Sequence, residues 1–288
     1  MHRRDFLKKS VALAVSPMVV QHGGLAQALT PRSSGPQAGA DGWVSLINGR
    51  DLDGWYSVLA QAGKDSASAR AMVTMEENML HILGNKAIGE PSQPGYIATH
   101  REFENVHIRV EYKWGVNRFA PRLEAKRDNG LLYGLVGEDK VWPTMVECQI
   151  EEGDVGDFFM VGTRGIQAPH GNGLFGEGIS PVTGWPKSES PGAPPPGFAQ
   201  RPAEPSGGRF IKDGNFELLD EWNTVEVLWQ GDKAAHIVNG RTVNVVTSLQ
   251  QPDPKNAGQH IPLTRGKIAI EIEFAEIWFR RIEVKSLA

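Results

Sequence analysis

The chain has 288 residues, with 30 basic and 34 acidic side chains and a formal net charge of −4 at pH 7. Residues 1–28 hold four basic side chains and one acid, so the remainder carries about −7, which disfavours nucleic acid and anionic membrane surfaces as partners. Cys148 is the only cysteine, which excludes an intramolecular disulfide and leaves stability to an apolar core.

The N-terminal residues predict an export signal. Arg3 and Arg4 precede an apolar run from Val11 to Val20, and an A-x-A cleavage motif ends residues 1–28. The apolar run is too short to span a bilayer, so no membrane insertion is expected. We therefore expect a twin-arginine signal peptide, a flexible linker at 29–40, and a periplasmic or secreted protein that is exported already folded.

The rest of the chain, 41–288, consists mainly of short alternating runs separated by turn residues. The clearest is Val106 to Trp114, in which every second residue is apolar, as expected for a strand with one buried face. Lys267 to Phe274 follows the same pattern, and Asn239-Gly240 between two runs predicts a hairpin. Only Ala67 to Glu77 could form a helix. This pattern predicts one all-β domain, a sandwich or jelly roll.

One segment, 168–208, departs from this spacing because 18 of its 41 residues are glycine or proline. Loops of this length in a compact domain are commonly lids, binding loops or disordered insertions. The sequence leaves open whether this insertion covers a site or is a surface excursion.

The stretch from residue 146 to 151 is the most informative of the chain. Its apolar residues face one side of a predicted strand, and Glu147, Gln149 and Glu151 face the other. A row made only of carboxylates and an amide indicates a polar ligand, a metal ion or proton-transfer chemistry. The alternative is an exposed acidic edge.

Six segments, in order, resemble the motifs of one bacterial family. They are Trp43–Trp55, Asp128–Tyr133, Glu147–Ile150, Glu221–Val225, His236–Gly240 and the C-terminal segment 266–284. The family is the 3-keto-disaccharide hydrolase or 3-keto-glucoside lyase-hydratase domain family, formerly a domain of unknown function. The resemblance extends from Asp41 to Leu287 and implies a concanavalin-like jelly roll of two antiparallel sheets. One departure is that Glu271-Ile272-Glu273-Phe274 stands where the family usually has Gln-Asp-His-Gly, so the family's histidine is missing.

The resemblance also implies a chemistry. In a 3-keto glycoside the ketone acidifies the proton on C2, so a base can remove it, the aglycone can leave by β-elimination, and water can add back. Glu147 is the expected base or metal ligand, and Gln149 would bind sugar hydroxyls. Arg127 would either neutralise an enolate or pair with an acid. A divalent metal ion that polarises the ketone is left open as a cofactor.

Further residues are expected to contact a small-molecule or oligosaccharide substrate. They are Glu151, Asp128, Asn129, Trp142, His236 and Asn239. A lone histidine is more often a surface or hydrogen-bonded residue than a ligand-binding one, so this alternative stays open for His236. The main alternative for the whole protein is a non-catalytic, lectin-like carbohydrate-binding module, and a third is a structural or interaction protein that uses the Pro-rich loop.

Overall fold

The computed structural model describes residues 41–84, 88, 92–168 and 204–287. The predicted signal peptide and linker lie outside the described residues, as does most of the Gly/Pro-rich insertion. Contacts divide the chain into Met1–Gly35 and Pro36–Ala288, and the fold reported below is that of the second unit.

Two sheets form this unit, and every pairing between strands is antiparallel. Sheet A contains β1 (Val44–Ser45), β4 (Val73–Glu76), β5 (Met79–Ile82), β7 (Val106–Arg118), β12 (Asn223–Gln230), β13 (Lys233–Val238), β14 (Arg241–Pro252), β15 (His260–Pro262) and β17 (Ala275–Ser286). Sheet B contains β2 (Trp55–Leu59), β3 (Gly63–Lys64), β6 (Gly95–Phe103), β8 (Gly130–Val136), β9 (Thr144–Gln149), β11 (Ser206–Phe210) and β16 (Gly266–Ile272).

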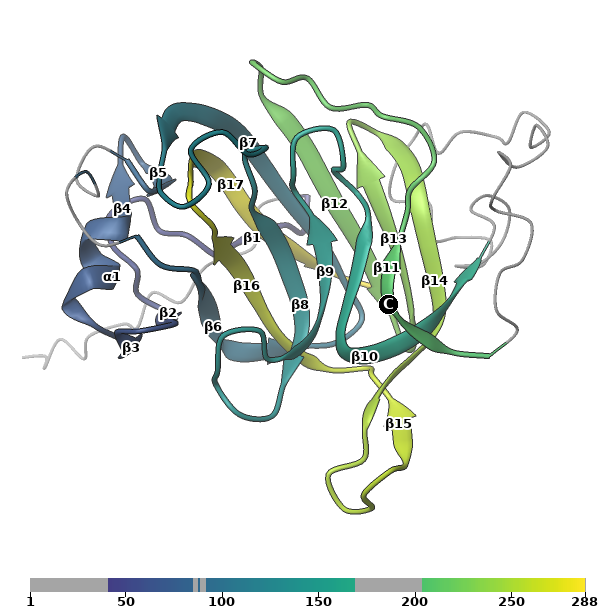
Figure 1. The fold of residues 1–288 in the computed structure, drawn as a ribbon. Coiled ribbons are helices and arrows are strands. Elements are labelled where there is room, and N and C mark those ends of the chain that lie inside the picture. Colours follow the sequence, from purple (N-terminus) through teal and green to yellow (C-terminus); the bar gives the residue numbers. More distant parts are fainter. Residues whose placement is uncertain (1–40, 85–87, 89–91, 169–203, 288) are drawn as a thin grey trace, which may run out of the picture. The chain divides into compact units, whose positions relative to one another are not determined.

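Strand β10 (Phe158–Ala168) belongs to both sheets. Its first half pairs with β9 and β11 in sheet B, and its last residues pair with β14 in sheet A, so it curves from one sheet into the other (Figure 1). Strand β16 lies between β6 and β8 in sheet B, and strand β17 lies between β5 and β7 in sheet A. The last strands of the chain thus pair with early strands in both sheets, and this arrangement confirms the predicted jelly roll.

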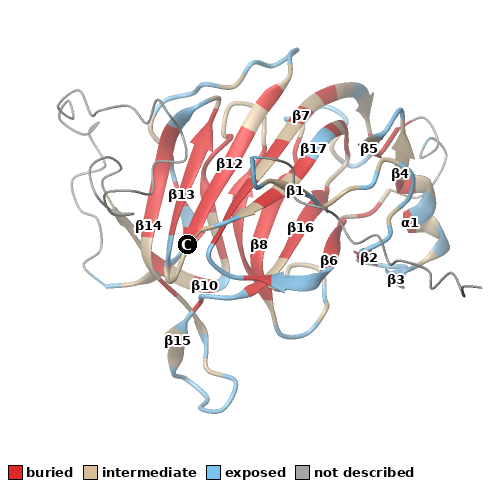
Figure 2. Ribbon diagram, turned by 180° about the vertical axis from the view of Figure 1, so that it is seen from behind, coloured by how far each residue is buried: buried red, intermediate tan, exposed pale blue. Residues whose placement is uncertain are grey.

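The main core lies between the two sheets. The five alternating apolar residues of β7 are all buried in it, as are Val146, Cys148 and Ile150 around β9. Figure 2 shows the buried residues concentrated along β8, β12, β13 and β16. Each fully buried aliphatic side chain stabilises the fold by about 1.5–3 kcal/mol relative to an exposed one, so this core fixes which face of each strand points outward.

The face of sheet B that points away from sheet A, called the outer face below, is also largely covered. A second apolar cluster occupies part of it, with Leu132, Met145 and Ala269 from the central strands. Val141 and Trp142, from the connection between β8 and β9, pack against this cluster. The polar residues that alternate with the core residues are therefore partly shielded from water.

Two local predictions can be compared directly with the structure. The hairpin at Asn239-Gly240 is confirmed, with both residues at positive φ as that turn requires. The helix is shorter than predicted: α1 spans Ala67–Met72, capped by Ser66, and the chain continues as strand β4. The β-branched pair at Val73 and Thr74 favours this change to extended backbone.

Among the described residues, no helix is long and apolar enough to cross a membrane.

Truncating the core of sheet B should cost much more stability than the same change on the surface. Ile270 is completely buried in the main core, whereas Ile211 is 56% exposed. We expect Ile270→Ala to lower the free energy of unfolding by about 2–5 kcal/mol and Ile211→Ala to change it by less than about 0.5 kcal/mol. Denaturant titration measures both, and equal losses would contradict the assigned core.

Candidate functional site

The register of three central strands gathers acidic side chains on the outer face of sheet B. Strand β8 lies between β9 and β16, with Leu132 opposite Glu147 on one side and Ala269 on the other. Just before β8, Asp128 is bridged to Glu273. Directly opposite residues of antiparallel strands share a face, so carboxylates from both neighbours of β8 converge at its start.

Gly130 makes this convergence possible. It occupies the outer face between the two acidic strands, and a Cβ atom there would lie 2.7 Å from both Glu147 Oε1 and Glu271 Oε2. Strands on either side of β8 are separated by about 10 Å, which is too far for short side chains to meet over a bulky residue. Because glycine leaves this space open, the carboxylates of Glu147 and Glu271 both reach into it from the two neighbouring strands.

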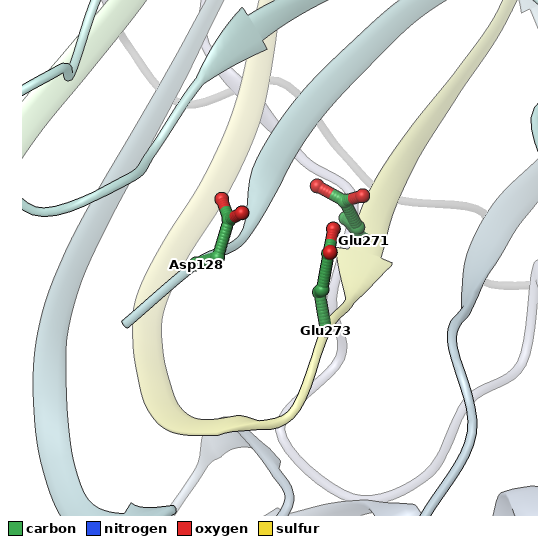
Figure 3. A group of neighbouring side chains, drawn as sticks. All are labelled: Asp128, Glu271 and Glu273. Atoms are coloured by element: carbon green, nitrogen blue, oxygen red, sulfur yellow. The ribbon is translucent and has the colours of Figure 1, made fainter. Parts of the chain in front are cut away.

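Three carboxylates form the tightest group within this cluster. Asp128, Glu271 and Glu273 can each offer one oxygen such that all three lie within 4.8 Å of one another. Figure 3 shows the three carboxylates side by side, with Asp128 on the chain entering β8, Glu271 near the end of β16 and Glu273 on the turn just after it. Glu271 Oε2 is buried and lacks a hydrogen-bond partner, as does Oε1 of the adjacent Gln149. This carboxylate triad offers three converging oxygen atoms, and a hard cation prefers several oxygen ligands.

Arg122, from the connection between β7 and β8, supplies positive charge to the cluster. Its guanidinium donates to Asp128 Oδ2 at 2.7 Å and to Glu273, and it lies 3.3 Å from Glu151 Oε1. Gln149 completes the network by donating from Nε2 to Asp128 Oδ1 at 3.0 Å. The acidic cluster thus has five acids, which are Asp128, Glu147, Glu151, Glu271 and Glu273. Arg122 contacts three of them, so carboxylates outnumber the cation that pairs with them.

Burial and crowding raise the pKa values of these acids. Burial, followed by the charges of neighbouring acids, raises the pKa of Glu147 and of Glu271 well above the usual range. Burial and the charge of Glu273 raise the pKa of Asp128 to about 7, although Arg122 opposes this shift. Burial also raises the pKa of Glu151. These shifts bring the pKa values of the acids closer to neutral pH, as general acid–base chemistry requires.

The structure brings together the three acidic residues predicted for the site, but not the predicted arginine. Glu147, Gln149 and Asp128 lie in the cluster, and Glu151 joins it through Arg122. Arg127 points elsewhere: its Nε donates to Glu152 Oε1 at 2.6 Å and its Nη1 to the carbonyl of Gly115 at 3.0 Å. Arg127 fixes the neighbouring turn instead.

His236 was expected to contact substrate, and its position corrects that prediction. It is fully buried between the sheets, where its ring stacks on Phe158 with ring centres 3.5 Å apart. Nδ1 lies 3.0 Å from the carbonyl of Gly156, and Nε2 lies 3.2 Å from the Tyr133 hydroxyl. Burial lowers its pKa to about 3, so the ring stays neutral and packs in the interior of the fold.

Three other predicted contacts lie at different places. Asn239 uses its amide within the fold, donating to the carbonyl of Phe216 at 2.7 Å. Asn129 is completely buried and donates to the carbonyl of Glu271 at 2.6 Å, so it positions the end of β16. Trp142 packs on the outer apolar cluster, and its contact with substrate stays a prediction.

Sequence reasoning missed Glu271, Glu273 and Arg122 as members of the site. The two glutamates alternate with buried isoleucines on β16, which would have placed them on a polar face. They also occupy the segment where the sequence departs from the resembled family motif. Arg122 gave no comparable signal, because its position depends on the path of an irregular loop.

A family model described as the 3-keto-alpha-glucoside-1,2-lyase-like domain matches residues 42–285. A search among curated proteins found no match. Among solved structures, a candidate glycosyl hydrolase from Parabacteroides distasonis ATCC 8503 is similar at 17% identity and a TM-score of 0.49, covering 86% of this chain and 95% of that one. The carbohydrate-binding module CBM66 from Bacillus subtilis is similar at 8% identity and a TM-score of 0.43, covering 81% and 96%. With TM-scores below 0.5, these structural likenesses assign no function.

Ionisation of Asp128 should make stability depend on pH. Its pKa in the folded protein, about 7, is above the ordinary value of 3.8, so the folded state binds a proton that the unfolded chain releases between these values. Stability contributed by this group is present at low pH and is lost as pH rises through 7. We therefore expect Asp128→Asn to gain stability relative to the unmodified protein between pH 5 and pH 8, by up to about 1.4 kcal/mol per pH unit.

Asp154→Asn is the matched control for this measurement. Hydrogen bonds from Lys126 and Arg209 lower the pKa of Asp154 to about 2 despite its partial burial, so it is ionised in both states above pH 5. Its stability difference from the unmodified protein should be constant over that range in thermal or denaturant unfolding. A constant difference for Asp128→Asn as well would show that Asp128 does not titrate as described.

Proposed function

This chain belongs to the family of 3-keto-alpha-glucoside-1,2-lyase-like domains, and from that premise we propose that it cleaves 3-keto glycosides at the acidic cluster of sheet B. The observation that carries the proposal is the group of buried carboxylates that converge over Gly130, where burial and neighbouring charge raise their pKa values. We further propose that the protein is exported by the predicted twin-arginine signal and acts outside the cytoplasm.

The proposed reaction needs proton transfer at two places. A base removes the proton from C2 of the sugar, the electron pair forms a C1–C2 double bond, and the C1–O bond to the aglycone breaks. The leaving oxygen takes up a proton. Water then adds across the double bond and restores a free 3-keto sugar, so that the net reaction is hydrolysis. Carboxyl groups with raised pKa values suit both proton transfers because their pKa values approach the working pH.

Glu147 is the proposed base. It lies beside the carboxylate triad but is not one of its three members, and its charge acts on Glu271. Its raised pKa makes it a stronger base than an exposed glutamate, provided that neighbouring negative charge is compensated so that it can ionise. Gln149 would bind a sugar hydroxyl through its unpartnered Oε1. Arg122 takes the place that the sequence suggested for Arg127, next to developing negative charge.

We propose that the carboxylate triad holds a divalent cation. The fit rests on three convergent oxygens and on the buried, unpartnered Glu271 Oε2. The donor set consists of oxygen alone, which favours Mg²⁺, Ca²⁺ or Mn²⁺ over softer ions. When bound, such an ion would polarise the C3 ketone and favour the ionised form of Glu147. It would share Asp128 and Glu273 with Arg122.

Removing the proposed base should abolish turnover while the protein stays folded. We expect Glu147→Gln to lower kcat on a neutral 3-keto disaccharide by about 10²- to 10⁴-fold, because general acid–base catalysis contributes this much. Glu226→Gln is the matched control, since Glu226 lies on β12 of sheet A and is as buried as Glu147, at 7% exposure. Product release measured by chromatography reports both variants.

The same assay separates this proposal from a lectin-like module. A binding module would bind the sugar without turning it over, in the unmodified protein as in both variants and with or without added cations. Equal activity of Glu147→Gln and Glu226→Gln would also contradict the assigned base.

Cation binding should be visible without any turnover. After dialysis against a chelator, Mg²⁺, Ca²⁺ or Mn²⁺ should raise the Tm, by an amount equivalent to about 2.7 kcal/mol at a hundredfold excess over Kd. The rise should shrink below pH 7 because protons compete for the same carboxylates. Glu273→Gln should abolish the shift and Glu226→Gln should keep it. A shift that survives in Glu273→Gln would place the cation elsewhere.

A further inference from the structure

An aromatic side chain stands directly beside the proposed base. Phe159 on β10 is paired with Glu147 on β9, so both side chains lie on the outer face of sheet B. Side chains that are directly opposite in antiparallel strands have Cβ atoms about 4.5–5.5 Å apart. The side chain of Phe159 therefore begins next to that of Glu147, whose carboxylate extends over Gly130 on the other side of β9.

Phe159 is not part of the apolar clusters of the fold. The neighbouring Phe158 points inward and is completely buried in the main core, whereas Phe159 is only half-buried. Within the part of the chain that the structure describes, Phe159 packs against none of the three apolar clusters. Its ring thus leaves apolar surface available next to a strongly polar cluster.

The ring is held in place by an immobilised cation. Arg209 is the partner of Phe159 on β11, and its guanidinium carbon lies 5.3 Å from the centre of the ring. Arg209 in turn contacts Asp157 Oδ2 at 2.6 Å and Asp154 Oδ2 at 3.1 Å. A guanidinium at this distance attracts the face of the ring, and the two carboxylates restrict its movement.

The other tryptophans and tyrosines near the cluster are already used by the fold. Tyr96, opposite Glu271 on β6, is completely buried in the outer apolar cluster. Trp142 packs against the same cluster, and Trp114 donates its indole N–H to Glu217 at 2.9 Å. Phe159 is therefore the aromatic residue on the described outer face that combines a position beside Glu147 with free apolar surface.

We propose that Phe159 is the platform on which a ring of the substrate stacks, and that it selects rings that are uncharged. This inference rests on the proposed function, since it places the substrate against Glu147. The C–H face of a pyranose or an aromatic aglycone would cover the phenyl ring and bury its apolar surface. The positive charges of Arg209 and Arg122 are each compensated by at least two carboxylates, so neither would attract an anionic ring.

Truncation and replacement of the ring test the proposal. Phe159→Ala should raise KM for a neutral 3-keto disaccharide by roughly 10- to 100-fold, as expected for losing a buried aromatic contact, with kcat changed less than about twofold. Phe159→Tyr should restore KM because it keeps the ring. Val161→Ala is the control, since Val161 is two residues along the same strand and face but packs on the outer apolar cluster. An analogue with a carboxylate on its second ring should bind more weakly than the neutral one to the unmodified protein.

A second measurement separates this inference from the proposed reaction. Calorimetric binding of an unoxidised neutral disaccharide to Glu147→Gln protein, with and without Phe159→Ala, needs no turnover. Turnover by the unmodified protein together with unchanged KM and Kd in Phe159→Ala would overturn the platform alone. Binding that weakens in Phe159→Ala, in a protein without turnover on any 3-keto glycoside, would overturn the reaction alone. A loss of kcat without a change in KM would also contradict a stacking role.

Discussion

The site depends on one constraint, the crowding of buried carboxylates over a single glycine. A carboxylate that leaves water loses much of its solvation, and this loss is tolerated only when protons, cations or hydrogen bonds compensate it. Here Arg122 and Gln149 provide part of the compensation, and raised pKa values provide more by keeping the acids protonated. The burial that lowers stability also supports the chemistry, because a buried acid with a raised pKa can exchange protons near neutral pH.

The remainder of the fold keeps this unfavourable cluster in place. Apolar residues on the inner face of β8, β9 and β16 anchor the strands to sheet A, so the acids cannot turn inward. The turn after β9 is fixed by two carboxylates. Glu217 accepts the Gly153 N–H at 2.7 Å, and Asp157 accepts the Lys212 N–H at 2.9 Å. Preorganised geometry of this kind lets polar groups act without rearranging during the reaction.

Much of the fold and half of the site follow from local patterns in the sequence. Alternation along Val106 to Trp114 and around Glu147 gives the correct face of each strand, because the period of two depends only on strand geometry. The neighbours of a strand are not encoded locally. The pairing of β16 with β8 joins segments more than a hundred residues apart, so Glu271 and Glu273 could be placed on a polar face but not beside Asp128. Phe159 escaped notice for the same reason, since only the register with β9 places it next to Glu147.

Proton exchange at C2 of the sugar tests the central claim most directly. A 3-keto glycoside incubated with the protein in heavy water can be followed by NMR, and loss of the C2 proton signal reports deprotonation independently of the later steps. The account predicts exchange or deuterium incorporation at C2 with the unmodified protein, and none above the uncatalysed rate when Glu147 is replaced by glutamine. Cleavage that leaves the C2 proton in place, or exchange that persists without the Glu147 carboxylate, would contradict it.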